Sequence, residues 1–201
     1  MIKEFFPDDP EVTKFRIKIF TEDLNLSPED LQTFDDHDTN NKFAYWYSDK
    51  KFLSNKFDRI LLHYYNGEAI GIAGGTYFNK DLYRCLQMIY ILKRARRIDE
   101  LNTLHFKDNG FFDYHIERAK NLGCRGLFYS VDPYDKRHII MYDYLRKNKS
   151  SMAHMPMAQR KYNASHFLFL DKEYEINYTK QKIAFFPFDK SDNFDSLFYG
   201  T

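Results

Sequence analysis

The stretch from residue 110 to residue 147 constrains the fold most, because it alternates between helical and strand patterns. Three apolar residues at helical spacing open it: Phe112, Ile116 and Ala119. Gly123 then predicts the end of that helix, since glycine readily adopts the positive φ of a C-terminal cap. Residues 127–131 form a short apolar run that favours a strand, and Pro133 ends it. A second helical pattern follows, so the stretch predicts half of a core made of a sheet and helices.

Composition narrows the class of protein. The chain has 201 residues and a formal net charge of +1, which suits one domain and gives no bulk attraction to nucleic acid or acidic membranes. Its 20 Phe and 16 Tyr residues predict a core built from aromatic rings. Cys85 and Cys124 lack metal or disulfide spacing, and no stretch approaches a membrane span. We therefore expect a cytoplasmic protein without a disulfide or a metal.

Caps, turns and periodicity predict the remaining elements. Asp9-Pro10 predicts the start of a helix, and Asn66-Gly67 predicts the two-residue turn of a hairpin. The patterns predict strands at 2–6, 59–65, 68–78, 83–92, 166–170 and 183–188, and helices at 10–23 and from 27 onward. We assign Trp46 to a candidate strand and leave residues 189–201 as an unassigned tail.

Two features leave both a ligand and a structural explanation open. Residues 35–38, Asp-Asp-His-Asp, carry three carboxylates and an imidazole. Contiguous loop residues seldom converge on one ion, so a solvated turn is favoured over a metal site. Glycines inside the second hairpin strand indicate a bend in the sheet, or a ligand lying on the strand. They are Gly71, Gly74 and Gly75.

The order of these elements resembles that of the GNAT superfamily of N-acetyltransferases: strand, two helices, hairpin, strand, helix, strand, helix and two strands. Residues 119–131, AKNLGCRGLFYSV, resemble its A-x-x-x-G-x-x-x-L-x-L-x-V segment, and residues 135–142, DKRHIIMY, are similar to its N-x-x-A-x-x-L-Y. The resemblance implies an α/β (α+β) fold with a mixed, mostly antiparallel twisted sheet of about six to seven strands and about four flanking helices. Residues 1–188 would form a single acyl-coenzyme A N-acyltransferase-like domain, with residues 189–201 as a C-terminal tail.

The resemblance also implies acetyl-coenzyme A, or another acyl-coenzyme A, as co-substrate. In the superfamily, V-x-P-x-x-R-G and Q/R-x-x-G-x-G/A hold its pyrophosphate at a helix N-terminus. Here residues 91–96, ILKRAR, lack the proline, and only Gly110 fits the second pattern, because Asp108 replaces a glycine. The residues implied for cofactor binding are Ile91, Leu92, Lys93, Arg96, Lys107, Asn109, Gly110 and Phe111.

This departure leaves two interpretations of the cofactor site. In the first, a remodelled loop still binds coenzyme A, and its phosphates meet Lys107 or the arginines at 94, 96 and 97. In the second, the site is altered or lost, and the basic run 93–97 contacts another anion. For the basic run by itself, a solvated strand end is the favoured explanation.

The implied reaction is acyl transfer to an amine on a small molecule or a protein. It needs a polarised thioester carbonyl and a proton for the leaving thiolate. By resemblance, a backbone N–H near Ile91 or Leu92 polarises the carbonyl, and Tyr142 returns the proton. Packing of a helix onto the sheet is the alternative role of Tyr142, and the favoured one. No general base stands out. Asp132 at a strand end and His115 on a helix are candidates, and the favoured role of each is a cap, a surface group or a hydrogen-bonded core residue.

Two alternatives to an N-acetyltransferase stay open. Missing glycines and abundant aromatics favour a catalytically inactive GNAT-fold module for binding or assembly. Residues 15–20 with Leu24 resemble the R-x-x-V-F…L opening of the acyl-homoserine-lactone synthases, but their E-S-R element is replaced by Lys-Arg-Ala-Arg at 93–96. The neutral charge argues against a nucleic-acid role. The acceptor, the acyl length and the oligomeric state are not determined by the sequence.

Overall fold

The computed structural model describes residues 1–34, 42–97, 110–131, 139, 142–143, 146 and 167–200, without the side chains of residues 42, 43 and 97. The chain forms two compact units. The first contains residues 1–76 and 88–102, and the second contains residues 77–87 and 103–201. The expectation of one domain over residues 1–188 stays a prediction.

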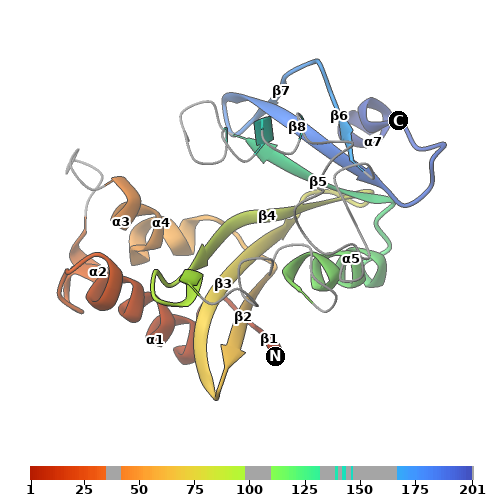
Figure 1. Ribbon diagram of the computed structural model, residues 1–201. Helices are drawn as coiled ribbons and strands as arrows, with labels where there is room; N and C mark the ends of the chain where they lie inside the picture. Colours follow the sequence, from red (N-terminus) through yellow and green to blue (C-terminus); the bar gives the residue numbers. More distant parts are fainter. Residues whose placement is uncertain are drawn as a thin grey trace. The chain divides into compact units, whose positions relative to one another are not determined.

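The chain contains both strands and helices, as the sequence indicates (Figure 1). The strands are β1 (Ile2–Phe5), β2 (Arg59–Tyr65), β3 (Glu68–Tyr77), β4 (Leu82–Ile91), β5 (Gly126–Val131), β6 (Leu168–Phe169), β7 (Tyr174–Ile176) and β8 (Thr179–Pro187). The α-helices are α1 (Pro10–Lys18), α2 (Asp30–Thr33), α3 (Lys42–Tyr47), α4 (Asp49–Ser54), α5 (Phe111–Asn121) and α7 (Phe194–Tyr199), and a π-helical segment, Ile19–Asp23, follows α1.

The strands form one eight-stranded sheet in the order β1-β2-β3-β4-β5-β8-β6, with β7 paired to β8. The β4–β5 pair is parallel, whereas the pairs β1–β2, β2–β3, β5–β8, β6–β8 and β7–β8 are antiparallel. This confirms the expected α/β class with a mixed, mostly antiparallel sheet. The sheet has one strand more than the upper expectation, because β7 forms within the connection between the two late strands.

In the first unit, α1 begins as predicted. Oδ1 of Asp9 accepts the backbone N–H of Glu11 at 2.8 Å, and Pro10 is the first helical residue. The π-helical segment extends the helical region to Asp23, the predicted end. The buried apolar face of α1 and this segment together contains four residues, also as predicted: Val12, Phe15, Ile19 and Phe20.

A buried cation connects α1 to the two helices that follow α2. The Arg16 side chain contacts Oδ1 of Asp49 at 2.7 Å, donates to the Tyr47 carbonyl at 3.1 Å and lies 4.2 Å from the centre of the Phe52 ring. Burial lowers the pKa of Arg16, and the carboxylate of Asp49 opposes that shift. This residue therefore has a structural role.

The hairpin of β2 and β3 confirms the Asn66-Gly67 turn. Both residues have positive φ, at 50° and 81°, as a two-residue hairpin turn requires. The register shifts between His63 and Tyr64, so the strand pair contains an irregularity of the expected kind.

Gly74 of β3 lies directly against an aromatic ring. A Cβ atom there would be 2.8 Å from Cδ1 of Phe57 and 3.1 Å from Cδ1 of Ile60, which is too close for any side chain. The absence of a side chain at Gly74 therefore lets the Phe57 ring pack against the strand. This packing explains the glycine without a ligand.

We predict that Gly74→Ala lowers the free energy of unfolding by about 1–3 kcal/mol, because the new methyl group displaces the Phe57 ring. Chemical denaturation of Gly74→Ala, Phe57→Leu and the double variant measures the coupling. A smaller ring-free side chain should reduce the cost of the methyl group. Full additivity of the two changes would contradict this explanation.

In the second unit, α5 and β5 confirm the predicted helix, turn and strand, with Gly123 at φ 78°. Neighbouring residues of β8 point to opposite faces of the sheet. Phe186 meets Phe112 of α5, with ring centroids 5.4 Å apart, whereas Phe185 meets Phe194 of α7 at 5.0 Å. The two helices therefore cover opposite faces of this part of the sheet (Figure 1).

Two assignments differ from the sequence analysis. Trp46 lies in α3, not in a strand, and its side chain is 40% exposed. The unassigned tail contains α7, whose Asn193 side chain accepts the Ser196 N–H at 3.3 Å as a helix cap. Leu197 of this helix belongs to the aromatic core of the second unit.

Candidate functional site

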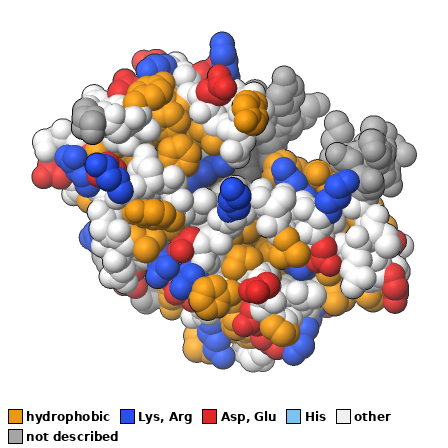
Figure 2. All heavy atoms as spheres, turned by 180° about the vertical axis from the view of Figure 1, so that it is seen from behind, with side chains coloured by type: hydrophobic (Ala, Val, Ile, Leu, Met, Phe, Trp, Pro, Cys, Tyr) orange, Lys and Arg blue, Asp and Glu red, His pale blue; other side chains and the backbone are white. Residues whose placement is uncertain are grey.

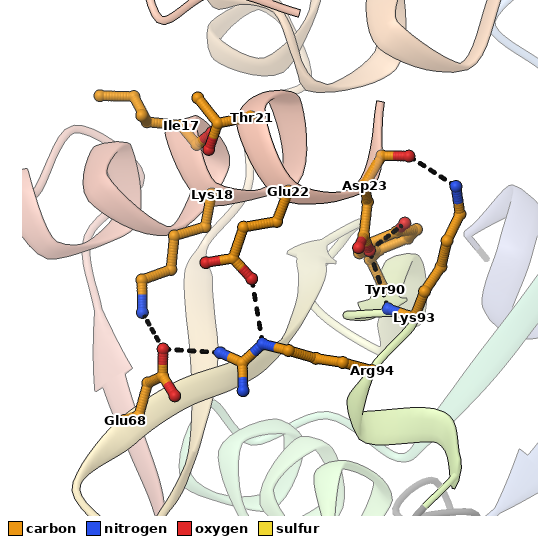
Figure 3. Close-up of polar contacts among 9 residues, drawn as sticks. All are labelled: Ile17, Lys18, Thr21, Glu22, Asp23, Glu68, Tyr90, Lys93 and Arg94. Atoms are coloured by element: carbon orange, nitrogen blue, oxygen red, sulfur yellow. Dashed lines mark hydrogen bonds and ion pairs between the residues drawn. The ribbon is translucent and has the colours of Figure 1, made fainter. Parts of the chain in front are cut away.

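The end of β4 is fixed to the end of the first helical region by one carboxylate. Oδ2 of Asp23 accepts the Tyr90 hydroxyl at 2.7 Å and the Lys93 backbone N–H at 2.8 Å. The Lys93 ammonium also donates to the Asp23 carbonyl at 2.5 Å. Figure 3 shows these groups converging on Asp23. The main chain after β4 is thus held in one geometry.

Two further acids neutralise Arg94 of the basic run. Arg94 contacts Oε2 of Glu22 at 3.0 Å and Oε1 of Glu68 at 2.6 Å, and Lys18 contacts the same Glu68 oxygen at 2.6 Å (Figure 3). The arginine and the lysine hold the pKa of Glu68 below its ordinary value, and the two carboxylates raise the pKa of Arg94. Arg94 is therefore already committed to two anions of its own chain.

The other expected cofactor contacts in this segment are also engaged. Arg96 Nε donates to the Ile91 carbonyl at 2.8 Å, and its guanidinium lies 4.8 Å from the centre of the Tyr90 ring. The Leu92 N–H donates to the Ile70 carbonyl at 3.0 Å. A thioester carbonyl could take the Leu92 N–H only in exchange for that bond.

We predict that Glu68→Gln destabilises the fold by at most about 1 kcal/mol at neutral pH, because the ion pairs are partly exposed. The folded-state pKa of Glu68 lies below its ordinary value of 4.5, so its charge stabilises the fold above that pH. The contribution disappears as the pH falls from there through the folded-state pKa.

Urea unfolding of wild type and Glu68→Gln between neutral and acid pH tests this dependence. Glu4→Gln, which removes an exposed carboxylate from β1, is the matched control. A wild-type advantage over Glu68→Gln that persists below the folded-state pKa, or an equal effect of Glu4→Gln, would contradict the prediction.

In the second unit, Gly110 begins α5. Its φ of −83° and ψ of −178° are extended, and it provides no side-chain cap for the helix. Phe111 and Phe112 follow as fully buried anchors. The first-turn N–H groups and the helix dipole make such a start favourable for an anion, although Asp113 adds a negative charge to the same turn.

Tyr142 lies in the second unit and is 1% exposed. Its hydroxyl donates to the Ile183 carbonyl of β8 at 3.3 Å, and its ring packs edge-on against Phe169 at 5.4 Å. Burial raises the pKa of its phenol, so the group is protonated at neutral pH. These contacts are those of a residue that packs onto the sheet.

Several predicted residues lie outside the described part of the chain: Asp132, Lys107, Asn109 and the acidic residues 35–38. His115 is described and is 2% exposed, with its ring 5.7 Å from that of Tyr83. Among the described residues, no group of three His, Cys, Asp or Glu side chains is placed to hold a metal ion. Cys85 and Cys124 are buried thiols.

The sequence analysis missed Asp23, the residue that organises the end of β4. Its partners Tyr90 and Lys93 are 67 and 70 residues away along the chain. The basic run was visible, but nothing local indicates which acids would neutralise it. An unusually acidic helix end at Glu22-Asp23 was the available signal.

On the face of the molecule drawn in Figure 2, neither positive nor negative side chains dominate. Lys and Arg side chains are interspersed with Asp and Glu on the face drawn in Figure 2. Within the described ranges, no helix has the length and apolar character needed to cross a bilayer.

The described order of elements agrees with the one that the GNAT resemblance implies in its first strand, hairpin, fourth strand, crossover helix α5, parallel strand and late antiparallel strands. It differs in having four helices before the hairpin and a third late strand, and the helix expected over residues 134–147 lies mostly outside the described residues. The described elements therefore agree with the expected fold class. No protein-family model matches the sequence, and no curated protein matches it.

The solved structures that are similar to this chain include acetyltransferases. An aminoglycoside 6'-acetyltransferase type Ii is 12% identical, with a TM-score of 0.49, over 93% of this chain and 96% of that chain. The ribosomal-protein-S18-alanine N-acetyltransferase from Escherichia coli is 11% identical, with a TM-score of 0.48, over 96% and 97%. A GNAT family acetyltransferase from Elizabethkingia anophelis with acetyl-CoA bound is 12% identical, with a TM-score of 0.44, over 93% and 97%.

Proposed function

We propose that this protein is an N-acyltransferase that moves an acyl group from acetyl-coenzyme A, or another acyl-coenzyme A, to an amine. The observation that carries the proposal is the parallel pairing of Leu82–Arg84 with Gly126–Phe128, with the glycine-capped helix α5 as the crossover between the two strands. Helix starts of this kind favour phosphate groups. The two buried thiols, which form no disulfide with each other, fit the proposed cytoplasmic location.

The proposed cofactor contacts fall in two sets. In the second unit, the N–H groups from Gly110 and Phe111 onward meet the phosphates, with Lys107 and Asn109. In the first unit, Ile91, Leu92, Lys93 and Arg96 at the end of β4 meet the acyl thioester. Leu92 and Lys93 have their N–H groups in bonds to Ile70 and Asp23, so contact there requires exchange of bonds.

Proposed catalysis uses Tyr142 and Asp132. Tyr142 would protonate the leaving thiolate, and its raised pKa keeps the phenol protonated until that step. The hydroxyl must release the Ile183 carbonyl to do so. Asp132 would take the proton from the attacking amine, directly or through water. The acceptor is a small molecule or a protein that presents a primary amine.

We predict that acetyl-coenzyme A raises the thermal midpoint, by several degrees at 100 times its dissociation constant, since such binding stabilises the fold by about 2.7 kcal/mol. Gly110→Asp and Gly110→Asn separate charge from size at the helix start. Both residues cap helices well, but only aspartate repels phosphate. Gly110→Asn should retain more of the shift than Gly110→Asp.

Equal shifts of the thermal midpoint in the two Gly110 variants would show that the phosphates do not bind at the start of α5. No shift in wild type with acetyl-coenzyme A or with longer acyl-coenzyme A would contradict the enzyme proposal. That outcome is the one expected of a non-catalytic binding module.

We predict that Tyr142→Phe lowers acyl transfer by about 10²–10⁴-fold while retaining the acetyl-coenzyme A shift, because the variant loses a general acid. It should also lose about 1 kcal/mol of stability with the bond to Ile183. The matched control is Tyr174→Phe, which loses a hydroxyl bonded to Asp195 at 2.8 Å. Similar losses of turnover in both variants would show that Tyr142 acts only through packing.

A further inference from the structure

A hollow of about 450 Å³ lies in the second unit, among Tyr142 and Arg146, the segment after β6, and β8. Its volume is in the range of small-molecule sites. Charged side chains dominate its lining: Arg146, Asp171, Glu173, Lys180 and Lys182, beside Tyr142 and Leu170. None of these residues is among those proposed to bind coenzyme A.

The two acids and three bases of the lining are not all paired with each other. Arg146 contacts Oδ1 of Asp171 at 3.0 Å, so these two charges neutralise each other. Within the described ranges, neither Lys180 nor Lys182 forms an ion pair with a carboxylate. This leaves two ammonium groups and the single carboxylate of Glu173 facing the hollow.

The position of the two lysines follows from the register of β8. Residues two apart on a strand share one face, so Lys180 and Lys182 project from the same side. The Lys182 ammonium lies 6.0 Å from the centre of the Tyr142 ring, which keeps it over the hollow. Two cations on one face repel each other, and an anion bound between them removes that repulsion.

We propose that this hollow is an anion site, which takes a small molecule carrying phosphate or carboxylate groups between Lys180 and Lys182. Arg146, oriented by Asp171, adds N–H donors at the same hollow but no net positive charge. The carboxylate of Glu173 repels a bound anion, and this repulsion limits the negative charge that the hollow can accept. The hollow shares Tyr142 with the proposed acyl-transfer site, but anion binding by the two lysines does not require acyl transfer.

Calorimetric titration with tripolyphosphate at physiological salt tests the site. Each ammonium near a phosphate oxygen contributes about 1 kcal/mol in water, or about fivefold in affinity. Lys180→Ala/Lys182→Ala should therefore bind at least about tenfold more weakly than wild type. Lys80→Ala/Lys190→Ala removes the same charge from exposed positions of the second unit and should change affinity less than about twofold.

A third variant keeps the test decisive if the double lysine variant folds poorly. Glu173→Gln removes the opposing charge and should tighten binding about two- to fivefold. Equal weakening in the two double variants, no tightening in Glu173→Gln, or no binding by wild type would overturn the proposal. Displacement of tripolyphosphate by acetyl-coenzyme A would assign the anion site to the cofactor and overturn it as a separate site.

Discussion

Aromatic rings packed onto glycine backbone are the constraint on which both units depend. In the first unit Phe57 lies against Gly74, and in the second a Cβ at Gly126 would be 2.6 Å from Cε2 of Phe185. A ring covers a strand closely only where no side chain stands in its way, so the glycines inside β3 and β5 are a condition of the core. Packing of rings in the core therefore accounts for the aromatic content of this chain, with its 20 Phe and 16 Tyr residues, without a stacked ligand.

Ion pairs within the first unit hold two of its arginines. Arg16 is buried against Asp49, and Arg94 is shared by Glu22 and Glu68. Cations that look available in the sequence are thus held by acids of the same chain. The proposed acyl-transfer chemistry at the end of β4 must rely on main-chain groups and on exchange of existing bonds, more than on free positive charge.

Local chemistry made much of the fold predictable. The Asp9-Pro10 cap, the Asn66-Gly67 turn and the Gly123 helix end are each determined by neighbouring residues, and the structure confirms all three. The α3 helix was missed because its short run of aromatic residues also suits a strand. The α7 helix was missed although Asn193 and Ser196 form its cap, because six residues give almost no periodicity.

The candidate site was less predictable, because its parts come from distant positions in the sequence. The choice of acid for each base depends on how strands are paired. Asp23 meets Lys93, and Glu68 meets both Lys18 and Arg94, only once β3 and β4 lie against the helical region. For Tyr142, the sequence and the structure indicate different roles. Its position in the motif indicated a catalytic role, whereas its buried hydrogen bond to Ile183 indicates packing.

The pairing of Arg94 has a consequence for how ionic strength affects this protein. A cation already neutralised within the chain has few loosely held counterions to release when a ligand arrives. Association at the end of β4 should accordingly vary little with salt concentration. In the described part of the chain, Lys180 and Lys182 of β8 form no ion pair, so dilute buffer should strengthen anion binding there and concentrated buffer should weaken it.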